Sequence, residues 1–195
     1  MSATPFDSTQ ITAAILAGGA GTRLGGRDKG LELLASKPLV AHVVDALRGQ
    51  AGSLLICANR NPERYAEFAP VCADAAPGFR GPLAGILAAL TACSTQWLLT
   101  VPVDCPRPPA DLARRLWSAV GAASAAVVDV DARREPLFAL YRRELAGSAQ
   151  AALQRDLPVW RWQDDMGAVA VDFSDARAGF VNLNAPEDFR LWKSL

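Results

Sequence analysis

A glycine-rich stretch near the amino terminus contains the residue types best suited to chemistry in this sequence. Five glycines fall between residues 18 and 26, Arg23 lies among them and Lys29 follows shortly after. Glycines let the backbone approach a ligand closely, and consecutive backbone amides bind anions. Arginine and lysine add bidentate and mobile positive charge, which suits a triphosphate. The stretch therefore predicts a phosphate-binding loop, with a solvated surface turn as the alternative.

Two familiar phosphate-binding loops do not fit this stretch. The dinucleotide-binding pattern G-x-G-x-x-G would need a glycine where Leu24 stands. A Walker A loop needs Gly-Lys followed by Ser or Thr, whereas Gly26 is followed by Arg27 and Asp28. A Rossmann dehydrogenase and a P-loop nucleotidase are both disfavoured.

Asp104 is a candidate metal ligand because it directly follows an apolar run that ends at Val103. Magnesium is usually held by one or two carboxylates together with phosphates and water. A metal ion there would offset the negative charge of transferring phosphates. The alternative is an ordinary turn aspartate ahead of Pro106.

Asn182 and Asn184 stand two positions apart, so in an extended segment their side chains share a face. Amides both donate and accept hydrogen bonds, which suits a heteroaromatic acceptor or its phosphate. Alternatively, Asn184 caps a helix that begins at Pro186. Earlier in the chain, segment 81–85 favours a helix start, where its glycines leave room for a flat base or for helix packing.

The elements that must position these residues alternate between strands and helices. Short apolar runs predict strands at 11–16, 53–58, 97–103, 125–130, 137–141, 168–173 and 180–183. Helical spacing and proline starts predict helices at 38–47, 62–68, 82–90, 109–120 and 145–153, with a closing helix from Pro186, while 160–166 is ambiguous.

This alternation predicts an α/β fold: one three-layer α/β/α domain around a mainly parallel, Rossmann-like sheet. We expect the domain to span residues 11–195, after a flexible lead-in at residues 1–10. Ligands bind such sheets beyond the carboxyl ends of the strands. The glycine loop, Asn59 and Asp104 each follow a predicted strand, so they should face one crevice.

Composition narrows the function. The 195 residues carry no formal net charge, which gives no support for a nucleic-acid or membrane role. The four cysteines form no C-x-x-C pair and His42 is the sole histidine, which disfavours zinc sites and histidine-based triads. No signal peptide or membrane span is recognisable, so we expect a cytoplasmic protein with buried thiols.

The segment 16–29, from Leu-Ala-Gly-Gly to Arg23 and Lys29, resembles the signature of nucleotidyltransferases with a glycosyltransferase-A-like fold. Further motifs narrow the resemblance to the molybdenum cofactor guanylyltransferase (MobA) family. They lie at residues 25–31, 58–60, 81–85, 102–106, 171–173 and 180–187, and the similarity extends from about Ile11 to Trp192.

The resemblance implies an enzyme that joins GMP from GTP to the terminal phosphate of molybdopterin-bound molybdenum cofactor, with Mg²⁺, and releases pyrophosphate. It implies Arg23, Lys29 and Asp104 as catalytic residues, Asp104 as the metal ligand, and Asn182 and Asn184 as acceptor contacts. The GTP contacts that it implies are Leu16, Ala17, Gly18, Gly19, Arg23, Lys29, Cys57, Asp74, Gly81, Pro82, Leu83, Gly85 and Asp104. Close relatives have asparagine where this chain has Cys57, which puts a side-chain contact there in doubt.

Other functions remain open on the sequence alone. The same chemistry could use CTP with molybdopterin, or a nucleoside triphosphate with a sugar 1-phosphate. A nucleotide-binding regulatory module that performs no chemistry is the alternative of a different class. Besides GTP and molybdopterin, candidate partners are other molybdenum-cofactor biosynthesis proteins and molybdoenzyme chaperones; no nucleic acid or membrane is expected.

Overall fold

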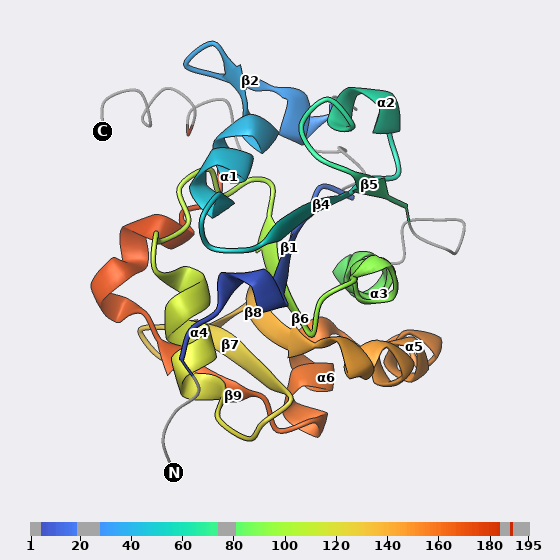
Figure 1. Cartoon of the computed structure of the whole chain (residues 1–195), viewed down its shortest axis with the longest axis vertical. Coiled ribbons are helices and arrows are strands. Elements are labelled where there is room, and N and C mark those ends of the chain that lie inside the picture. The colour runs from blue at the N-terminus through green and yellow to red at the C-terminus, as the bar shows by residue number, and fades with distance from the viewer. Residues whose placement is uncertain (1–4, 19–27, 74–80, 184–187, 189–195) are drawn as a thin grey trace.

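The computed structural model describes residues 5–18, 28–73, 81–183 and 188 of the chain (Figure 1). In this part of the chain, the main sheet has seven strands in the order β5-β4-β1-β6-β8-β7-β9. Their bounds are β1 Ile11–Leu16, β4 Ser53–Cys57, β5 Val71–Cys72, β6 Trp97–Pro102, β7 Ala125–Val130, β8 Arg133–Arg142 and β9 Val169–Asp172.

Most neighbouring strands run parallel, as the sequence predicts. β1 is parallel to β4 and β6, β4 is parallel to β5, and β7 is parallel to β9. Only β8 runs against both of its neighbours, β6 and β7. The carboxyl ends of β5, β4, β1 and β6 therefore meet at one edge of the sheet, which is the edge where ligands bind in such folds.

Helices cover both faces of the sheet and complete the three layers (Figure 1). One face packs against α1 (Leu39–Leu47) and α4 (Leu112–Val120), and the other against α3 (Pro82–Ala92), α5 (Ala146–Gln154) and α6 (Val159–Asp165). Strand β1 shows why: Ile11, Ala13 and Ile15 join the first cluster, whereas Ala14 joins the second. Successive side chains of a strand point to opposite faces, so a strand that is buried on both faces is apolar almost throughout. In β1 the exception is Thr12, whose hydroxyl is hydrogen-bonded to those of Ser53 and Thr95.

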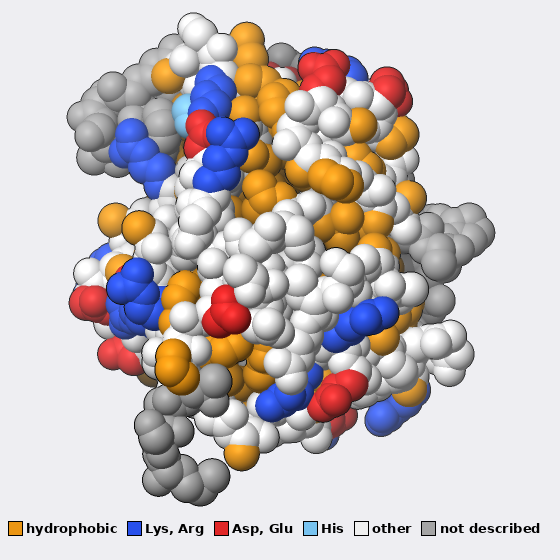
Figure 2. Space-filling view, in the orientation of Figure 1, with side chains coloured by type: hydrophobic (Ala, Val, Ile, Leu, Met, Phe, Trp, Pro, Cys, Tyr) orange, Lys and Arg blue, Asp and Glu red, His pale blue; other side chains and the backbone are white. Residues whose placement is uncertain are grey.

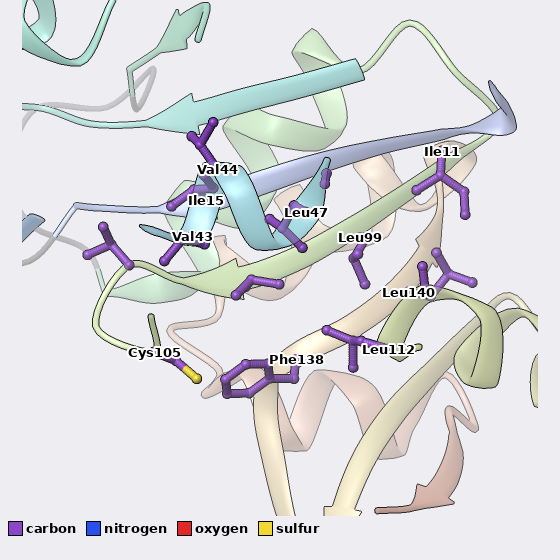
Figure 3. Packing of buried hydrophobic residues seen from close by; sticks show 14 of the residues in the cluster. Ile11, Ile15, Val43, Val44, Leu47, Leu99, Cys105, Leu112, Phe138 and Leu140 are labelled. Carbon is purple, nitrogen blue, oxygen red and sulfur yellow. The ribbon is translucent and has the colours of Figure 1, made fainter. Parts of the chain in front are cut away.

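The core under α1 and α4 is dense with branched side chains (Figure 3). Val43 and Leu47 of α1 and Leu112 of α4 pack with Leu99 and Leu140 of the sheet, and all five are fully buried. Each such side chain contributes about 1.5–3 kcal/mol on burial. This packing gives the strand ends a rigid base.

Short elements follow the strands that end at the ligand-binding edge. A 3₁₀ turn, η3 (Lys29–Leu31), leads into the hairpin of β2 (Leu33–Leu34) and β3 (Lys37–Pro38). Helix α2 (Pro62–Tyr65) follows β4. In the turn between β2 and β3, Ala35 and Ser36 have positive φ, at 49° and 66°. Positive φ at both central residues is typical of the type I′ turns that short hairpins favour.

Several element boundaries differ from the sequence expectations. Helix α4 begins at Leu112 and not at Pro109, α2 ends at Tyr65 and not at residue 68, and residues 159–165 form α6. The expected strand at 180–183 is wrong, because Ser174–Phe180 form the 3₁₀ segment η5 and 181–183 have no regular structure. Phe180 explains this: its ring packs against those of Phe138 and Phe173, which anchors the segment beneath the sheet edge. The closing helix from Pro186 falls largely outside the described residues.

Residues 5–10, part of the expected lead-in, contact the domain at two points. Phe6 makes an edge-to-face contact with Trp117 of α4 at 6.0 Å between ring centroids. Ser8–Gln10 form a 3₁₀ turn, η1, and the Ser8 carbonyl accepts a hydrogen bond from the Gly52 N–H at 2.6 Å.

Acidic and basic side chains are interspersed on the face shown in Figure 2. Within the described ranges, no helix has both the length and the apolar character needed to span a bilayer.

Candidate active site

The main-chain pairing of β1 with its neighbours continues past the strand ends and fixes the candidate site. The Ala17 N–H donates to the Cys57 carbonyl at 2.9 Å, and the Val103 N–H donates to the Leu16 carbonyl at 3.1 Å. Leu16, Ala17, Cys57 and Asp104 therefore lie at one edge of the sheet. Of the groups that the sequence predicts to face one crevice, Asp104 lies at this edge, and a Cβ on Gly18, at the start of the glycine loop, would lie 3.8 Å from Asn59 Nδ2.

Lys29 and Asp104 form an ion pair at this edge. Lys29 Nζ donates to Asp104 Oδ2 at 2.8 Å, and the two side chains keep only 20% and 22% of their surface exposed. Partial burial weakens solvent screening, so each charge acts on its surroundings more strongly than an exposed charge would. The pair joins the end of the glycine-rich segment to the end of β6.

Asp28 holds this lysine segment in place. Its Oδ1 accepts a hydrogen bond from the Tyr65 hydroxyl at 2.5 Å, and its Oδ2 accepts one from Asn61 Nδ2 at 2.9 Å. Burial, reinforced by the Asp28 carboxylate, raises the pKa of Tyr65 well above its ordinary value, so the hydroxyl stays a donor. Asn61 adopts a left-handed conformation at the start of α2, with φ at 48°.

Gly30 allows the lysine segment to lie against Tyr65 and β6. A Cβ at this position would overlap the Tyr65 hydroxyl and come within 2.9 Å of Val103 Cγ2. Because the tyrosine is fully buried, it has little room to move away. A glycine is therefore required on steric grounds immediately after Lys29.

Sequence reasoning missed this group of Asp28, Asn61 and Tyr65. The partners of Asp28 stand 33 and 37 positions along the chain. No local periodicity links positions so far apart, and only the tertiary fold brings them together. The motif at residues 25–31 indicates that this segment matters, but not which residues hold it in place.

Asn182 is brought beside Asp104 by the main chain. The Leu183 N–H donates to the Asp104 carbonyl at 2.9 Å, and the Cys105 thiol donates to the Gly179 carbonyl at 2.9 Å. These two bonds fix the segment 179–183 along the end of β6. Asn182 itself is exposed, so its amide can reach a ligand.

The start of α3 lies on the opposite side of the sheet from α1. Gly81 precedes it with φ at 77°, a conformation that glycine adopts readily, and Pro82 takes the first helical position. Leu83 is 2% exposed and belongs to the same apolar cluster as Cys57, so only its backbone is available for a ligand. Gly81 and Pro82 are exposed, and Gly85 is half-buried.

Four of the expected site residues, Gly19, Arg23, Asp74 and Asn184, lie outside the described residues. Among those that the structure describes, no group of three or more His, Cys, Asp or Glu side chains is arranged to hold a metal ion. Asp104 alone supplies a carboxylate at the end of β6. That donor set fits Mg²⁺, which commonly takes one carboxylate and completes its shell with phosphate oxygens and water.

A family model for the MobA-like NTP transferase domain matches residues 13–169. The chain belongs to this family. It is 42% identical over 184 residues to the molybdenum cofactor guanylyltransferase of Shewanella loihica, covering 92% of this chain and 94% of that protein. It is 41% identical over 186 residues to the enzyme of the same name from Serratia proteamaculans, covering 94% of each.

Solved structures support the fold. Molybdopterin-guanine dinucleotide biosynthesis protein A from Archaeoglobus fulgidus aligns with a TM-score of 0.77 and 21% identity, over 94% of this chain and 100% of that one. The 2-C-methyl-D-erythritol 4-phosphate cytidylyltransferase of Thermus thermophilus aligns with a TM-score of 0.69 and 15% identity, over 96% and 98%. The α/β nucleotidyltransferase fold that the sequence predicts is thus confirmed.

Proposed function

We propose that this chain transfers GMP from GTP to the phosphate of molybdopterin-type molybdenum cofactor, forming the guanine dinucleotide cofactor and releasing pyrophosphate. The observation that carries the proposal is the 42% identity, over 92% of the chain, to a protein named molybdenum cofactor guanylyltransferase. The Lys29–Asp104 pair at the carboxyl edge of the sheet supplies the charged groups that such a transfer needs.

The reaction is a direct displacement at the α-phosphorus of GTP. A phosphate oxygen of the acceptor forms the new bond to phosphorus, and the bond to the β-phosphate oxygen breaks as pyrophosphate leaves. The attacking oxygen is already anionic, so no histidine or cysteine nucleophile is needed. Catalysis then depends on positioning the groups and neutralising their charge.

Lys29 and Asp104 have different roles in neutralising the charge. Lys29 donates to a phosphate oxygen of the triphosphate, and Asp28, held by Tyr65 and Asn61, keeps the lysine segment in position. Asp104 is the residue that would hold Mg²⁺, and the metal would offset negative charge on the phosphates. Arg23 is a further candidate for a phosphate contact.

The two substrates lie on either side of this pair. Leu16, Ala17, Gly18 and the start of α3 at Gly81–Gly85 accommodate the guanine nucleotide, together with Gly19 and Asp74. Asn182 and Asn184 contact the molybdopterin acceptor. Asn182 supports this arrangement because it lies beside Asp104 and is exposed.

A transfer assay tests the proposal. The purified chain, GTP, Mg²⁺ and molybdopterin-type cofactor should yield the guanine dinucleotide and one pyrophosphate per transfer. Replacing GTP by CTP should give little product; a preference for CTP would instead identify a cytidylyltransferase. Binding of nucleotide without any transfer would favour a regulatory module.

We also propose a cytoplasmic location, with other molybdenum-cofactor biosynthesis proteins and molybdoenzyme chaperones as partners.

A further inference from the structure

Two cysteines lie side by side at the nucleotide edge of the sheet. Cys57 ends β4, Cys72 ends β5, and the two are direct partners in the parallel register. The Cys72 thiol donates to Cys57 Sγ at a sulfur–sulfur distance of 3.2 Å. Both residues are reduced in the structure.

This arrangement is close to that of a disulfide. Neighbouring strands lie about 4.8 Å apart, within the Cα separation of about 4.4–6.8 Å at which disulfides form. The two sulfurs would have to approach by only about 1 Å to reach bonding distance. Among the described residues the short β5 strand pairs only with β4, so a small shift of β5 would bring the sulfurs together.

The two thiols differ in access, which sets the order of a thiol–disulfide exchange. Cys57 is 3% exposed, whereas Cys72 is half-buried. The Cys72 thiolate attacks glutathione disulfide, forms a mixed disulfide and releases one glutathione. The Cys57 thiol, as thiolate, then attacks the Cys72 sulfur and displaces the second glutathione. The two protein thiols are oxidised and one glutathione disulfide is reduced to two glutathiones. The two protons of the protein thiols end on the two glutathione sulfurs.

The pair is connected to the backbone that surrounds the nucleotide site. The Cys57 carbonyl accepts the Ala17 N–H at 2.9 Å, and the Cys72 carbonyl accepts the Ala58 N–H at 3.0 Å. The Cys57 side chain shares an apolar cluster with Leu83 at the start of α3, and Leu16 packs against the same cluster. The two cysteines therefore pack among the groups that the proposed function places around the guanine, namely Leu16, Ala17 and the start of α3.

We propose that Cys57 and Cys72 form a reversible redox site, whose oxidation to a disulfide by a low-molecular-weight disulfide weakens nucleotide binding. The effect on the nucleotide rests on the proposed GTP site, whereas the disulfide itself does not. Cytosolic disulfides are generally transient and regulatory, which suits this role.

The other two cysteines serve as an internal reference. Cys93 and Cys105 are each 1% exposed. The Cys105 thiol donates a hydrogen bond to the Gly179 carbonyl at 2.9 Å, and such burial keeps both thiols from contact with a disulfide in solution. Only the Cys57–Cys72 pair should respond to a mild disulfide oxidant.

The test uses the full reduced chain, equilibrated with glutathione disulfide. Thiols are counted after unfolding, the cross-linked peptides are identified by mass spectrometry, and GTP affinity is measured by calorimetry with Mg²⁺. We expect two of the four thiols to disappear, a 57–72 cross-link, and a fall in GTP affinity of about fivefold or more. Reduction with dithiothreitol should restore both values.

Two substitutions sharpen the result. Cys72→Ser should prevent the cross-link and abolish the oxidant's effect on GTP affinity. If this variant folds poorly, Cys72→Ala replaces it. Cys93→Ser, a matched change of a buried cysteine, should leave both intact. Four surviving thiols, or oxidised protein with unchanged GTP affinity, would overturn the proposal. If the reduced chain fails to bind GTP, the proposed function fails, while the thiol count still decides whether the disulfide forms.

Discussion

At the scale of single residues, the most demanding prediction concerns the effect of replacing Asp104 on GMP transfer. Asp104→Asn keeps the shape of the side chain but removes the charge that pairs with Lys29 and would hold a divalent metal. We expect GMP transfer to fall by about 10²-fold or more, because electrostatic groups of this kind are commonly worth that much. Steady-state transfer rates measure the effect.

Asp45→Asn is the matched control for Asp104→Asn. Asp45 also pairs with a lysine, Lys37, but this pair lies on the surface, with side chains 48% and 37% exposed. Surface ion pairs contribute little, so this variant should transfer GMP at the wild-type rate. Equal rates for all three proteins would remove Asp104 from the chemistry.

Tyr65→Phe tests whether the hydrogen bond to Asp28 positions Lys29. Removing the buried hydroxyl should lower the free energy of unfolding by about 1 kcal/mol. It should also lower kcat, because Asp28 loses one of the two hydrogen bonds that hold its carboxylate.

Tyr141→Phe separates the positioning effect from a general loss of stability. Tyr141 is equally buried, and its hydroxyl accepts a hydrogen bond from Gln163 Nε2 at 2.6 Å, between β8 and α6. This variant should lose comparable stability but keep its kcat. If the two variants lose kcat to the same extent, Tyr65 has no specific role in positioning.

The sequence could reveal some of these residues but not others. Asp104 was recognisable because it directly follows an apolar strand, and Lys29 because a cation ends the glycine stretch. No sequence pattern indicates Tyr65 and Asn61, because their role depends on hydrogen bonds to Asp28, which is distant in the sequence. Such tertiary contacts leave no local pattern.

At the scale of elements, Gly30 controls how η3 packs against α2 and β6. Gly30→Ala places a methyl group against Tyr65 and Val103, and overpacking of this kind costs about 1–3 kcal/mol. We expect a lower denaturant midpoint together with weaker GMP transfer, because Lys29 moves with the turn.

Gly147→Ala is the control for Gly30→Ala, since Gly147 lies in α5 with nothing within 4 Å of a Cβ. Its denaturant midpoint should stay the same or rise slightly. A Gly30→Ala protein that matches it in stability and activity would show that the space around Gly30 is not restrictive.

The elements themselves were predictable to different degrees. Strands β1, β4, β6 and β7 are mainly apolar runs, and the sequence predicts them close to their bounds. In β8 the sequence predicts only the apolar part, because the first residues, Arg133–Pro136, are three charged residues and a proline. The expected strand at 180–183 failed because Phe180 owes its burial to contacts with Phe138 and Phe173 and not to sheet pairing.

At the scale of the whole molecule, the alternation of strands and helices correctly predicted three layers and a mainly parallel sheet. It could not predict that β8 runs against β6 and β7, because periodicity records burial and not strand direction. Nor did composition reveal that Phe6 docks on Trp117, since one aromatic residue in a polar segment gives no pattern.

We propose that the carboxyl edge of the sheet, where Leu16, Ala17 and the start of α3 accommodate the base and Lys29 and Asp104 serve the phosphates, selects a guanine nucleotide. Calorimetric binding of GTP, CTP, ATP and UTP to the reduced chain, with and without Mg²⁺, tests it most directly. We expect GTP to bind at least about tenfold more tightly than the other three nucleotides, and Mg²⁺ to strengthen this binding. Tighter binding of CTP, or equal binding of all four nucleotides, would contradict it.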